Sequence, residues 1–463
     1  MNNIAQHDTI CAIATAPGGA IGIVRVSGDD AISIANGLFR PARLDAKPLS
    51  ERKSHTVAFG RIVDFSGQTI DEVLITVFRA PNSYTGENAV EISCHASSYI
   101  LQRVISLLIE AGCRMAEPGE YTQRAFLNGR MDLSQAEAVA DLIASQSAAA
   151  HHLAMNQMRG AFSTELASLR ERLLHLTSLM ELELDFSDHE ELEFADRTEL
   201  DTVAAQIEDK VASLVASFQL GNAIKQGVPV AIVGETNAGK STLLNRLVGE
   251  ERAIVSDIRG TTRDVIEDVV NISGVQFRFI DTAGLRETTD EIEAIGVQRA
   301  YEKVAQSQIV LLLLDATEAP RQLAELFPKI APHAQEKPLF VAVNKADLAH
   351  PTLQLPEGAT LTYLSAKTGE GISALKELLV STLHLDRLSG NDVIVTNARH
   401  HEALTRAHEA IRRVRTGLAN DVPTDLVSED LRDCLAHLAS ITGGEIATNE
   451  VLGNIFKHFC VGK

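Results

Sequence analysis

One octapeptide constrains the fold of this chain more than any other feature. Residues 234–241 read Gly-Glu-Thr-Asn-Ala-Gly-Lys-Ser, which matches the pattern G-x-x-x-x-G-K-[ST]. An aliphatic run at 228–233 precedes it, and a helix is expected to begin near Lys240. The backbone N–H groups of such a loop, with the N-terminus of the helix, face phosphate groups. The octapeptide therefore predicts an α/β domain with a buried strand, a phosphate-binding loop and a helix.

Three further motifs follow in the order that is typical of guanine-nucleotide-binding domains. They are Asp-Thr-Ala-Gly at 281–284, Asn-Lys-Ala-Asp at 344–347 and Ser-Ala-Lys at 365–367. Aliphatic strand patterns precede the first two. The Asp347 carboxylate can accept hydrogen bonds from N1–H and the 2-amino group of guanine, a pair of donors that adenine lacks. The four motifs predict a Ras-like domain that binds and hydrolyses GTP.

The motifs also predict a Mg²⁺ site. Lys240 should bridge the β- and γ-phosphates, and the Ser241 hydroxyl should bind Mg²⁺. Thr262 lies in the segment Gly-Thr-Thr-Arg-Asp at 260–264, the expected switch I, and is the second predicted Mg²⁺ ligand. Asp281 is expected to hold the ion through a water molecule.

Leu285 departs from the Ras-like pattern. It follows the Asp-Thr-Ala-Gly motif, where Ras-like proteins have a glutamine that orients the attacking water. Hydrolysis therefore needs another group to position water and another positive charge in the transition state.

Two backbone contacts with the nucleotide are also expected. The amide of Gly284 should sense the γ-phosphate, and the backbone of 365–367 should contact guanine O6.

Composition restricts the class of protein. A length of 463 residues allows about three domains. The net charge of −20 argues against non-specific nucleic-acid binding over the whole surface, so an RNA contact needs a local basic patch or a partner. Five widely spaced cysteines without a C-x-x-C pair argue against a disulfide framework and a zinc site. No signal-peptide pattern or membrane-spanning run is present in the sequence, so we expect a cytoplasmic protein with no membrane association.

The texture of the chain predicts a multidomain α/β and α architecture. Residues 1–125 alternate β-rich stretches, at 21–26, 73–77 and 89–92, with turns, and a helix pattern follows at 98–111. This predicts an N-terminal α+β domain at 1–125. The remaining predicted boundaries are a helical domain in two halves, 126–222 and 386–463, with the GTPase domain, 223–385, inserted between them.

Helical periodicity carries the prediction of the helical domain. Ser134 and Glu137 form a capping-box pattern before an alanine-rich helix. Apolar side chains then recur every three or four residues in two stripes far apart in the chain. The stripes are Leu166, Leu169, Leu173, Leu176 and Met180, and Leu404, Ala407, Ile411, Val414 and Leu418. The two halves are expected to pack together, which brings the ends of the inserted domain close to each other.

Four features of the chain occur together: Asn237 in the phosphate loop, the segment 260–264, Asp-Thr-Ala-Gly-Leu-Arg at 281–286 and the C-terminal Phe-Cys-Val-Gly-Lys at 459–463. With these features the whole chain resembles the bacterial tRNA-modification GTPase family MnmE, also called TrmE. At 235–236 the chain has Glu-Thr where many members have another residue followed by proline. We expect no loss of function from this departure.

The resemblance implies a specific activity. The chain would be a potassium-activated GTPase that works with an FAD-dependent partner of the MnmG (GidA) family. Together they would form a 5-carboxymethylaminomethyl-type modification at the wobble uridine of certain tRNAs. A tetrahydrofolate derivative, 5-formyl- or 5,10-methylene-, would donate one carbon. The family also implies a homodimer and a heterotetramer with the partner.

A potassium site beside the phosphates is also implied by the resemblance. Asn237, the backbone carbonyls of Ser256 and Ile258, and Thr261 would hold the ion, which would supply the charge of an absent arginine finger. Glu293 matches the water-positioning glutamate of the family, although an acid in an acidic helix start is usually solvated surface.

The motifs and the resemblance together predict two further sets of residues. Arg286 joins Glu293 and Cys460 as a predicted catalytic residue. The nucleotide and metal contacts are Asn237, Ala238, Gly239, Lys240, Ser241, Thr242, Ser256, Asp257, Ile258, Arg259, Gly260, Thr261, Thr262, Asp281, Thr282, Ala283, Gly284, Asn344, Lys345, Ala346, Asp347, Ser365, Ala366 and Lys367.

Folate contacts map by the resemblance to Arg25, Glu91, Arg130 and Lys463. A carboxylate such as Glu91 can read the donor–acceptor edge of a pterin, and basic groups can meet the glutamate tail. Each of these residues taken alone could be part of a surface ion pair. Cys460 could be a nucleophile for uridine C6 or a structural thiol near the ligand.

Three alternatives stay open at the level of the sequence. A basic stretch (Arg399, Arg406, Arg412, Arg413 and Arg415) is either an RNA-facing patch or a solvated helix face. The chain could be a GTP-dependent assembly or signalling switch without one-carbon chemistry. Its N-terminal region could also serve only for dimerisation.

Overall fold

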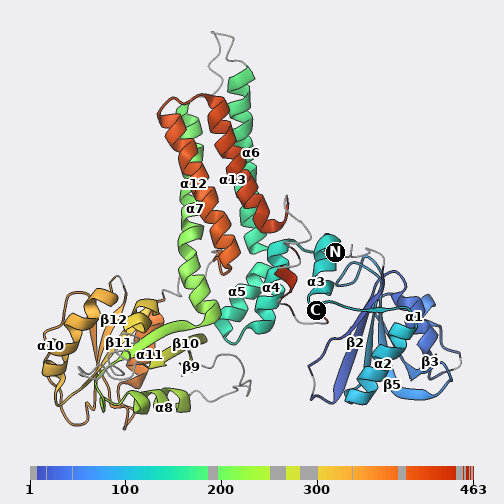
Figure 1. Ribbon diagram of the computed structural model, residues 1–463, viewed down its shortest axis with the longest axis horizontal. Helices are drawn as coiled ribbons and strands as arrows, with labels where there is room; N and C mark the ends of the chain where they lie inside the picture. The colour runs from blue at the N-terminus through green and yellow to red at the C-terminus, as the bar shows by residue number, and fades with distance from the viewer. Residues whose placement is uncertain are drawn as a thin grey trace, which may run out of the picture. The chain divides into compact units, whose positions relative to one another are not determined.

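The computed structural model divides the chain into two compact units. Residues 1–140 with 436–463 form the first unit, and 141–435 form the second. The structure describes residues 8–16, 18–43, 45–185, 197–250, 267–281, 301–335, 337–383 and 393–444, and also 452, 455–457, 459 and 462. None of the described helices combines the length and the apolar character needed to cross a membrane. The fold class is the predicted multidomain α/β and α architecture (Figure 1).

The first unit contains a seven-stranded sheet with the strand order β3-β4-β5-β6-β2-β1-β7. Helices α1 and α2 cover one face of it, where alternate strand residues form the core (Figure 1). The predicted strands and the helix at 98–111 are present. The elements are β1 Ile10–Ile13, β2 Ile21–Ser27, α1 Ala31–Leu38, β3 Phe39–Pro41, β4 Thr56–Val63, β5 Thr69–Phe78, β6 Ala89–His95, α2 Ser98–Glu110 and β7 Arg114–Met115.

The opposite face of this sheet is covered only in part by the described residues. Tyr121, on α3 (Glu120–Leu127), packs with Ile10 and Ala12 of β1. Farther along the same face, Phe59 pairs with Leu74, and these side chains are 54% and 48% exposed. The sheet therefore keeps an exposed apolar area beyond α3.

The second unit contains a six-stranded sheet with the order β13-β12-β11-β8-β10-β9. Only β9 runs antiparallel to its neighbour, so the carboxyl ends of the other five strands meet at one edge. The strands are β8 Val228–Val233, β9 Glu267–Ile272, β10 Val275–Asp281, β11 Ile309–Asp315, β12 Leu339–Asn344 and β13 Ala359–Tyr363. Helices α8 (Lys240–Glu250), α10 (Ala319–Ile330) and α11 (Ile372–Ser381) pack against them. Helix α8 begins at Lys240, as predicted.

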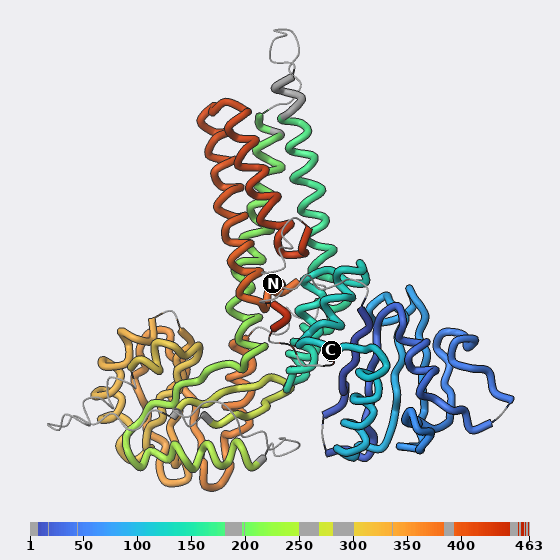
Figure 2. The backbone as a smooth tube through the Cα atoms, turned by 45° about the vertical axis from the view of Figure 1, so that its right-hand side comes forward, coloured from blue at the N-terminus to red at the C-terminus, as the bar shows by residue number. Residues whose placement is uncertain are grey.

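Long helices form the rest of the second unit, and they lie side by side in Figures 1 and 2. All ten residues of the two predicted apolar stripes are buried, on α6 and α12. This confirms both stripes as packed helix faces. The helices are α5 Ala148–Met158, α6 Ala161–Asp185, α7 Arg197–Gln226, α12 Ala398–Ala419 and α13 Thr424–Thr442, which runs on into the first unit.

The sheet domain is inserted into the helical part at neighbouring positions. The chain enters the domain where α7 ends at Gln226, and it returns along α7 before α12 begins. The Val395 amide donates to Ser217 Oγ at 3.1 Å. A Cβ on Gly221 would lie 2.2 Å from the Val395 carbonyl oxygen, so only glycine permits this approach. The predicted boundaries at 125/126 and 222/223 fall inside α3 and α7, and the four-domain division stays a prediction.

The capping-box prediction for α4 was wrong in its position. Helix α4 spans Leu133–Ala144, so Ser134 lies inside it. The capping pair is Asp132 and Gln135. Asp132 Oδ1 accepts from the Gln135 amide at 2.9 Å, and Gln135 Oε1 accepts from the Asp132 amide at 2.9 Å. Asp132 offers an N-cap carboxylate two residues earlier, with glutamine at the required spacing, and this reciprocal pair determines where the helix begins.

We predict different effects for two neighbouring leucines of α6. Leu173 is fully buried, so Leu173→Ala should lower the free energy of unfolding by about 2–5 kcal/mol. Leu174 is 40% exposed, and Leu174→Ala should cost less than about 1 kcal/mol. Urea unfolding of the full chain, followed by loss of helical circular dichroism, measures both. Equal effects would contradict the packing of α6.

Candidate functional site

The phosphate loop has the backbone geometry of an anion-binding turn. Asn237 and Gly239 have φ angles of 73° and 96°, in the left-handed region. A Cβ on Gly239 would lie 2.2 Å from Asn344 Nδ2, so glycine is required there. Lys240 is buried and its Nζ donates to the Gly234 carbonyl at 2.8 Å. The lysine side chain thus lies along the loop at the start of α8.

The side chain of Asn344 joins three of the predicted motifs. Its Nδ2 donates to the Ala238 carbonyl in the phosphate loop at 2.8 Å. Its Oδ1 accepts from the Ala366 amide at 2.9 Å. Asn344 is only 2% exposed, so both hydrogen bonds are shielded from water. The amide group therefore holds the phosphate loop and the two guanine motifs in one arrangement.

Two charged residues of the same motif, Lys345 and Asp347, lie close to Asn344 in the chain. Asp347 is exposed beside it, where its carboxylate can accept from a ligand. Lys345 has a φ of 62°, and its Nζ forms a 2.5 Å ion pair with Asp315 Oδ2. Burial alone would raise the pKa of Asp315, but Lys345 and Thr317 outweigh it and hold this pKa below its usual value. The carboxylate thus stays ionised and holds the lysine at the rim of the site.

A second candidate site is a cavity of about 150 Å³ in the first unit. Arg25 and Glu91 face each other across β2 and β6, with Arg25 Nε and Nη2 at 3.0 and 2.8 Å from Glu91 Oε1. The Arg25 guanidinium also lies 5.6 Å from the Tyr121 ring and 5.8 Å from the Tyr84 ring. Aromatic walls with one ion pair suit a flat, polar heterocycle. The lining residues are Arg25, Ser27, Phe78, Tyr84, Thr85, Ala89, Glu91 and Tyr121.

The C-terminal segment approaches this cavity. Arg25 Nη1 donates to the Gly462 carbonyl at 3.2 Å, although these residues are 437 positions apart. A Cβ on Gly462 would lie 2.5 Å from the Ile13 carbonyl oxygen. Arg130 is exposed, and its side-chain carbons lie near Gly86, beside the loop that carries Tyr84. The structure thus brings Arg25 and Glu91 together, with Arg130 at a neighbouring loop rather than in the cavity lining.

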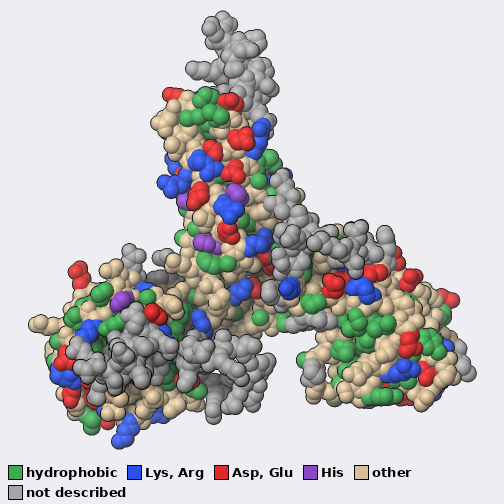
Figure 3. All heavy atoms as spheres, in the orientation of Figure 1, with side chains coloured by type: hydrophobic (Ala, Val, Ile, Leu, Met, Phe, Trp, Pro, Cys, Tyr) green, Lys and Arg blue, Asp and Glu red, His purple; other side chains and the backbone are tan. Residues whose placement is uncertain are grey.

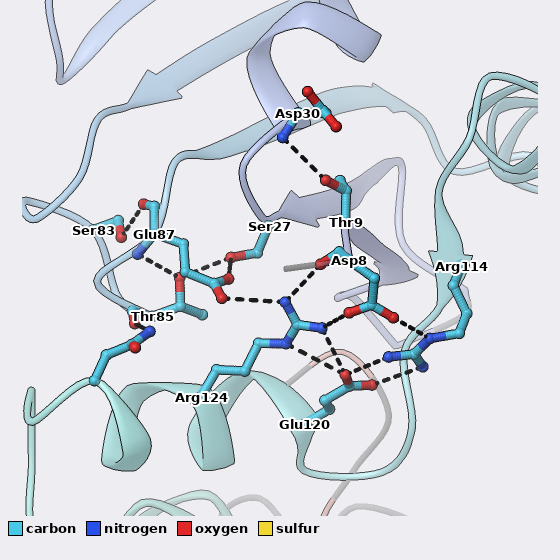
Figure 4. Close-up of polar contacts among 11 residues, drawn as sticks. Asp8, Thr9, Ser27, Asp30, Ser83, Thr85, Glu87, Arg114, Glu120 and Arg124 are labelled. Carbon is cyan, nitrogen blue, oxygen red and sulfur yellow. Dashed lines mark hydrogen bonds and ion pairs between the residues drawn. The ribbon is translucent and has the colours of Figure 1, made fainter. Parts of the chain in front are cut away.

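A buried cluster of charges supports the loop beside the cavity (Figure 4). The Arg124 guanidinium points at the carboxylates of Glu87 (3.1 Å), Glu120 (2.9 Å) and Asp8 (2.5 Å). Glu120 also pairs with Arg114 at 2.6 Å. The other Glu87 oxygen accepts from Ser27, which lines the cavity. Helix α3 and β2 are therefore joined through Glu87, by an ion pair with Arg124 and a hydrogen bond from Ser27.

Comparison with known proteins finds one family over nearly the whole chain. A model of the MnmE helical domain matches residues 133–460, and a model of the GTP-binding protein TrmE N-terminus matches residues 9–130. The chain is 57% identical over 462 residues to the tRNA modification GTPase MnmE of Parabacteroides distasonis, covering 98% of this chain and 100% of that protein. The chain belongs to the MnmE family.

A second MnmE relative and one solved structure are also similar to the chain. The MnmE protein of Flavobacterium johnsoniae is 50% identical, with 99% of this chain and 100% of that protein covered. The alignment with a crystal structure of Era from Aquifex aeolicus includes 39% of this chain and 66% of the Era chain. The two are 29% identical, and the TM-score is 0.26.

Several predicted residues of this MnmE-family chain lie outside the described residues. They comprise the expected switch I, the residues after Asp281, the proposed catalytic residues and the last lysine. Their roles stay predictions. They are Ser256, Asp257, Ile258, Arg259, Gly260, Thr261, Thr262, Thr282, Ala283, Gly284, Arg286, Glu293, Cys460 and Lys463.

Carboxylates neutralise much of the basic stretch on α12. Arg415 bonds Asp201 at 2.9 Å and Glu208 at 2.7 Å, both on α7. Arg413 bonds Asp430 at 2.6 Å. Basic and acidic side chains are interspersed over the visible face of the helices (Figure 3). The structure favours an ion-paired helix face over an RNA-facing patch.

Sequence reasoning missed several residues of these sites. Asp315 follows an aliphatic strand at the carboxyl edge of a parallel sheet, where ligand sites gather, and that position was a usable signal. Tyr84 and Tyr121 line the cavity but follow no local pattern that would have distinguished them from core aromatics. They reach the cavity only through the packing of α3 and its neighbouring loop.

The buried charge cluster predicts a loss of stability in acid. Burial by itself would raise the pKa of Glu120, but Arg114, the Glu117 amide and Arg124 outweigh it and lower this pKa. Because the folded-state pKa is depressed, the stabilisation is complete above the unfolded-state value of about 4.3 and is lost as the pH falls below it. Glu120→Gln should cost about 3 kcal/mol at pH 7 and flatten the pH dependence between about 5 and 3.

Urea unfolding of the full chain at several pH values checks this prediction. Glu110→Gln is the matched control, because Glu110 is 49% exposed and its ion pair among the described residues is with Arg103 at 3.4 Å. Its pH dependence should equal that of the wild type. A Glu120→Gln protein with the wild-type pH dependence would show that the cluster contributes little.

Proposed function

We propose that this chain is a GTPase that takes part in tRNA modification. The observation that carries the proposal is the pair of hydrogen bonds from Asn344 to Ala238 and from Ala366 to Asn344, which unites the phosphate loop with both guanine motifs. Membership of the MnmE family supports the same activity, since full-length relatives are named tRNA modification GTPases. Mg²⁺ would bind at Ser241, the first exposed hydroxyl of α8.

We infer that potassium activates hydrolysis. Asn237 is exposed at the turn of the phosphate loop, where its φ angle is 73°. Leu285 cannot orient water, so a cation beside the phosphates would supply positive charge in the transition state. Ser256, Ile258 and Thr261 are the proposed remaining ligands, with Glu293 positioning the water.

The cavity of the first unit is the proposed site for a tetrahydrofolate derivative. Glu91 Oε1 accepts both bonds from Arg25, and Oε2 has no hydrogen-bond partner among the described residues, so it can accept from donors of a pterin ring. Tyr84 and Tyr121 supply aromatic surfaces beside it. With an FAD-dependent partner of the MnmG family, the one-carbon unit would be used for the 5-carboxymethylaminomethyl-type group at the wobble uridine. Cys460 is a proposed nucleophile.

The proposed assembly is a homodimer that joins the partner in a heterotetramer. The exposed apolar area around Phe59 and Leu74 supports dimerisation through the first unit, because such an area is typical of an interface. A switch without one-carbon chemistry remains the second candidate function. The Arg25–Glu91 cavity favours the first candidate, since a switch needs no such cavity.

One prediction of the proposed function concerns tRNA from cells that lack this gene. Mass spectrometry of nucleosides should show loss of the C5-substituted wobble uridines and their return with the wild-type gene. Glu91→Gln should fail to restore them, because it removes the carboxylate proposed to read the folate, and Cys460→Ser tests the thiol. Glu72→Gln is the control, since Glu72 is an exposed acid on the neighbouring strand β5. If the deletion strain had unchanged nucleosides, a switch without one-carbon chemistry would be the remaining candidate function.

A second prediction tests the cation. GTP hydrolysis by the full chain with Mg²⁺ should be faster in KCl than in NaCl, and Asn237→Ala should reduce this stimulation at least about 10-fold. Binding of a fluorescent GDP should persist, because the substitution leaves Lys240 and Asn344 in place. Asn245→Ala, at an exposed position of α8, should keep the stimulation. Equal rates in both salts would refute potassium activation.

A further inference from the structure

Glu235, the acid that departs from the common family pattern, does not project freely into solvent. Its side chain is 16% exposed and lies against α10. Its two carboxylate oxygens accept from Arg321 at 3.2 and 3.1 Å. Glu235 also closes the turn of the phosphate loop, because its carbonyl accepts from the Ala238 amide at 3.2 Å. Any constraint on this residue therefore acts on the loop.

A buried glutamine of α10 makes the second contact with Glu235. Gln322 is 3% exposed, and its Nε2 donates to Glu235 Oε2 at 3.1 Å. Its Oε1 accepts from the Asp315 amide at 2.8 Å. One side-chain amide thus bridges the phosphate loop and the end of β11, with its donor used on one side and its acceptor on the other.

The bridge continues to the guanine motif. Asp315 pairs with Lys345 Nζ, and its other oxygen accepts from Thr317 at 3.0 and 2.8 Å. The position of the Asp315 backbone therefore affects the position of Lys345. A buried amide left without partners is costly, so the Gln322 contacts are expected to hold both ends rigidly.

We propose that Gln322 is a positioning residue of the nucleotide site, which sets the phosphate loop through Glu235 and the guanine motif through Asp315 and Lys345. The inference rests on the proposed GTP-binding function. Glu235 then has a role in nucleotide binding by this chain, although its departure from the common family pattern was expected to cause no loss of function. In this proposal Gln322 acts on the nucleotide through Glu235 and Asp315 and not by direct contact.

The test compares nucleotide binding by full-length variants. Gln322→Leu removes both hydrogen bonds and should raise the Kd for a fluorescent GDP about 10-fold. Gln322→Glu keeps an acceptor for the Asp315 amide but places a carboxylate against Glu235, and should weaken binding similarly. The double variant Glu235→Gln/Gln322→Glu exchanges amide and carboxylate across the same contact and should recover the wild-type Kd to within about 3-fold.

The kinetics of GTP hydrolysis also distinguish a positioning role of Gln322 from a role in packing alone. KM for GTP should rise in the single variants, whereas kcat at saturating GTP should stay within about 2-fold, because the substitutions should weaken binding of the ground state and of the transition state equally. Glu325→Gln is the control, since Glu325 is 52% exposed and pairs with Arg321 without touching the loop. Its Kd should equal that of the wild type.

Each outcome has one meaning. Wild-type protein that fails to bind GDP would overturn the proposed function, and the inference with it. If the wild type binds GDP and Gln322→Leu binds it with the same Kd, the inference alone would be overturned. If Gln322→Leu does not fold, the exchange pair decides: a double variant as weak as Gln322→Glu would overturn the positioning role.

Discussion

The side-chain amide of Asn344 is the interaction on which the proposed nucleotide site depends. It accepts from one loop and donates to another, and both bonds are buried, so neither loop can move without leaving a polar group unpaired. Residue 239 has to be glycine because the Asn344 side-chain amide occupies the space that a Cβ would need. The parallel strands β8, β12 and β13 end at the same edge, which is why the loops that follow them can meet at one side chain.

Buried charge has the corresponding role in the first unit. Arg124 is almost fully buried, and three carboxylates from separate segments compensate its charge. Such a cluster is costly to desolvate, so its geometry must be well satisfied to persist. Through Glu87 and Ser27 it reaches the cavity that contains Arg25 and Glu91, which is the proposed folate site. In both units, buried polar contacts determine where the candidate ligand groups lie.

Much of the local structure could be predicted. The apolar stripes at Leu166–Met180 and Leu404–Leu418 recur with the helical period, and burial of every member follows from it. The octapeptide at 234–241 predicted both the strand before it and the start of α8. The capping box failed because Asp132 and Gln135 offer the same reciprocal pattern two residues earlier, and a pattern search gives no means to rank the two pairs.

The sequence by itself determined the element types, the four nucleotide motifs and the family resemblance, because each can be recognised from short contiguous runs of residues without knowing which distant runs touch. Tertiary structure alone decided which distant residues touch. Gly462 lies against Arg25, Tyr84 and Tyr121 face one cavity, and Gln322 bonds Glu235. These contacts depend on strand order and helix packing, which bring together segments that no local periodicity relates.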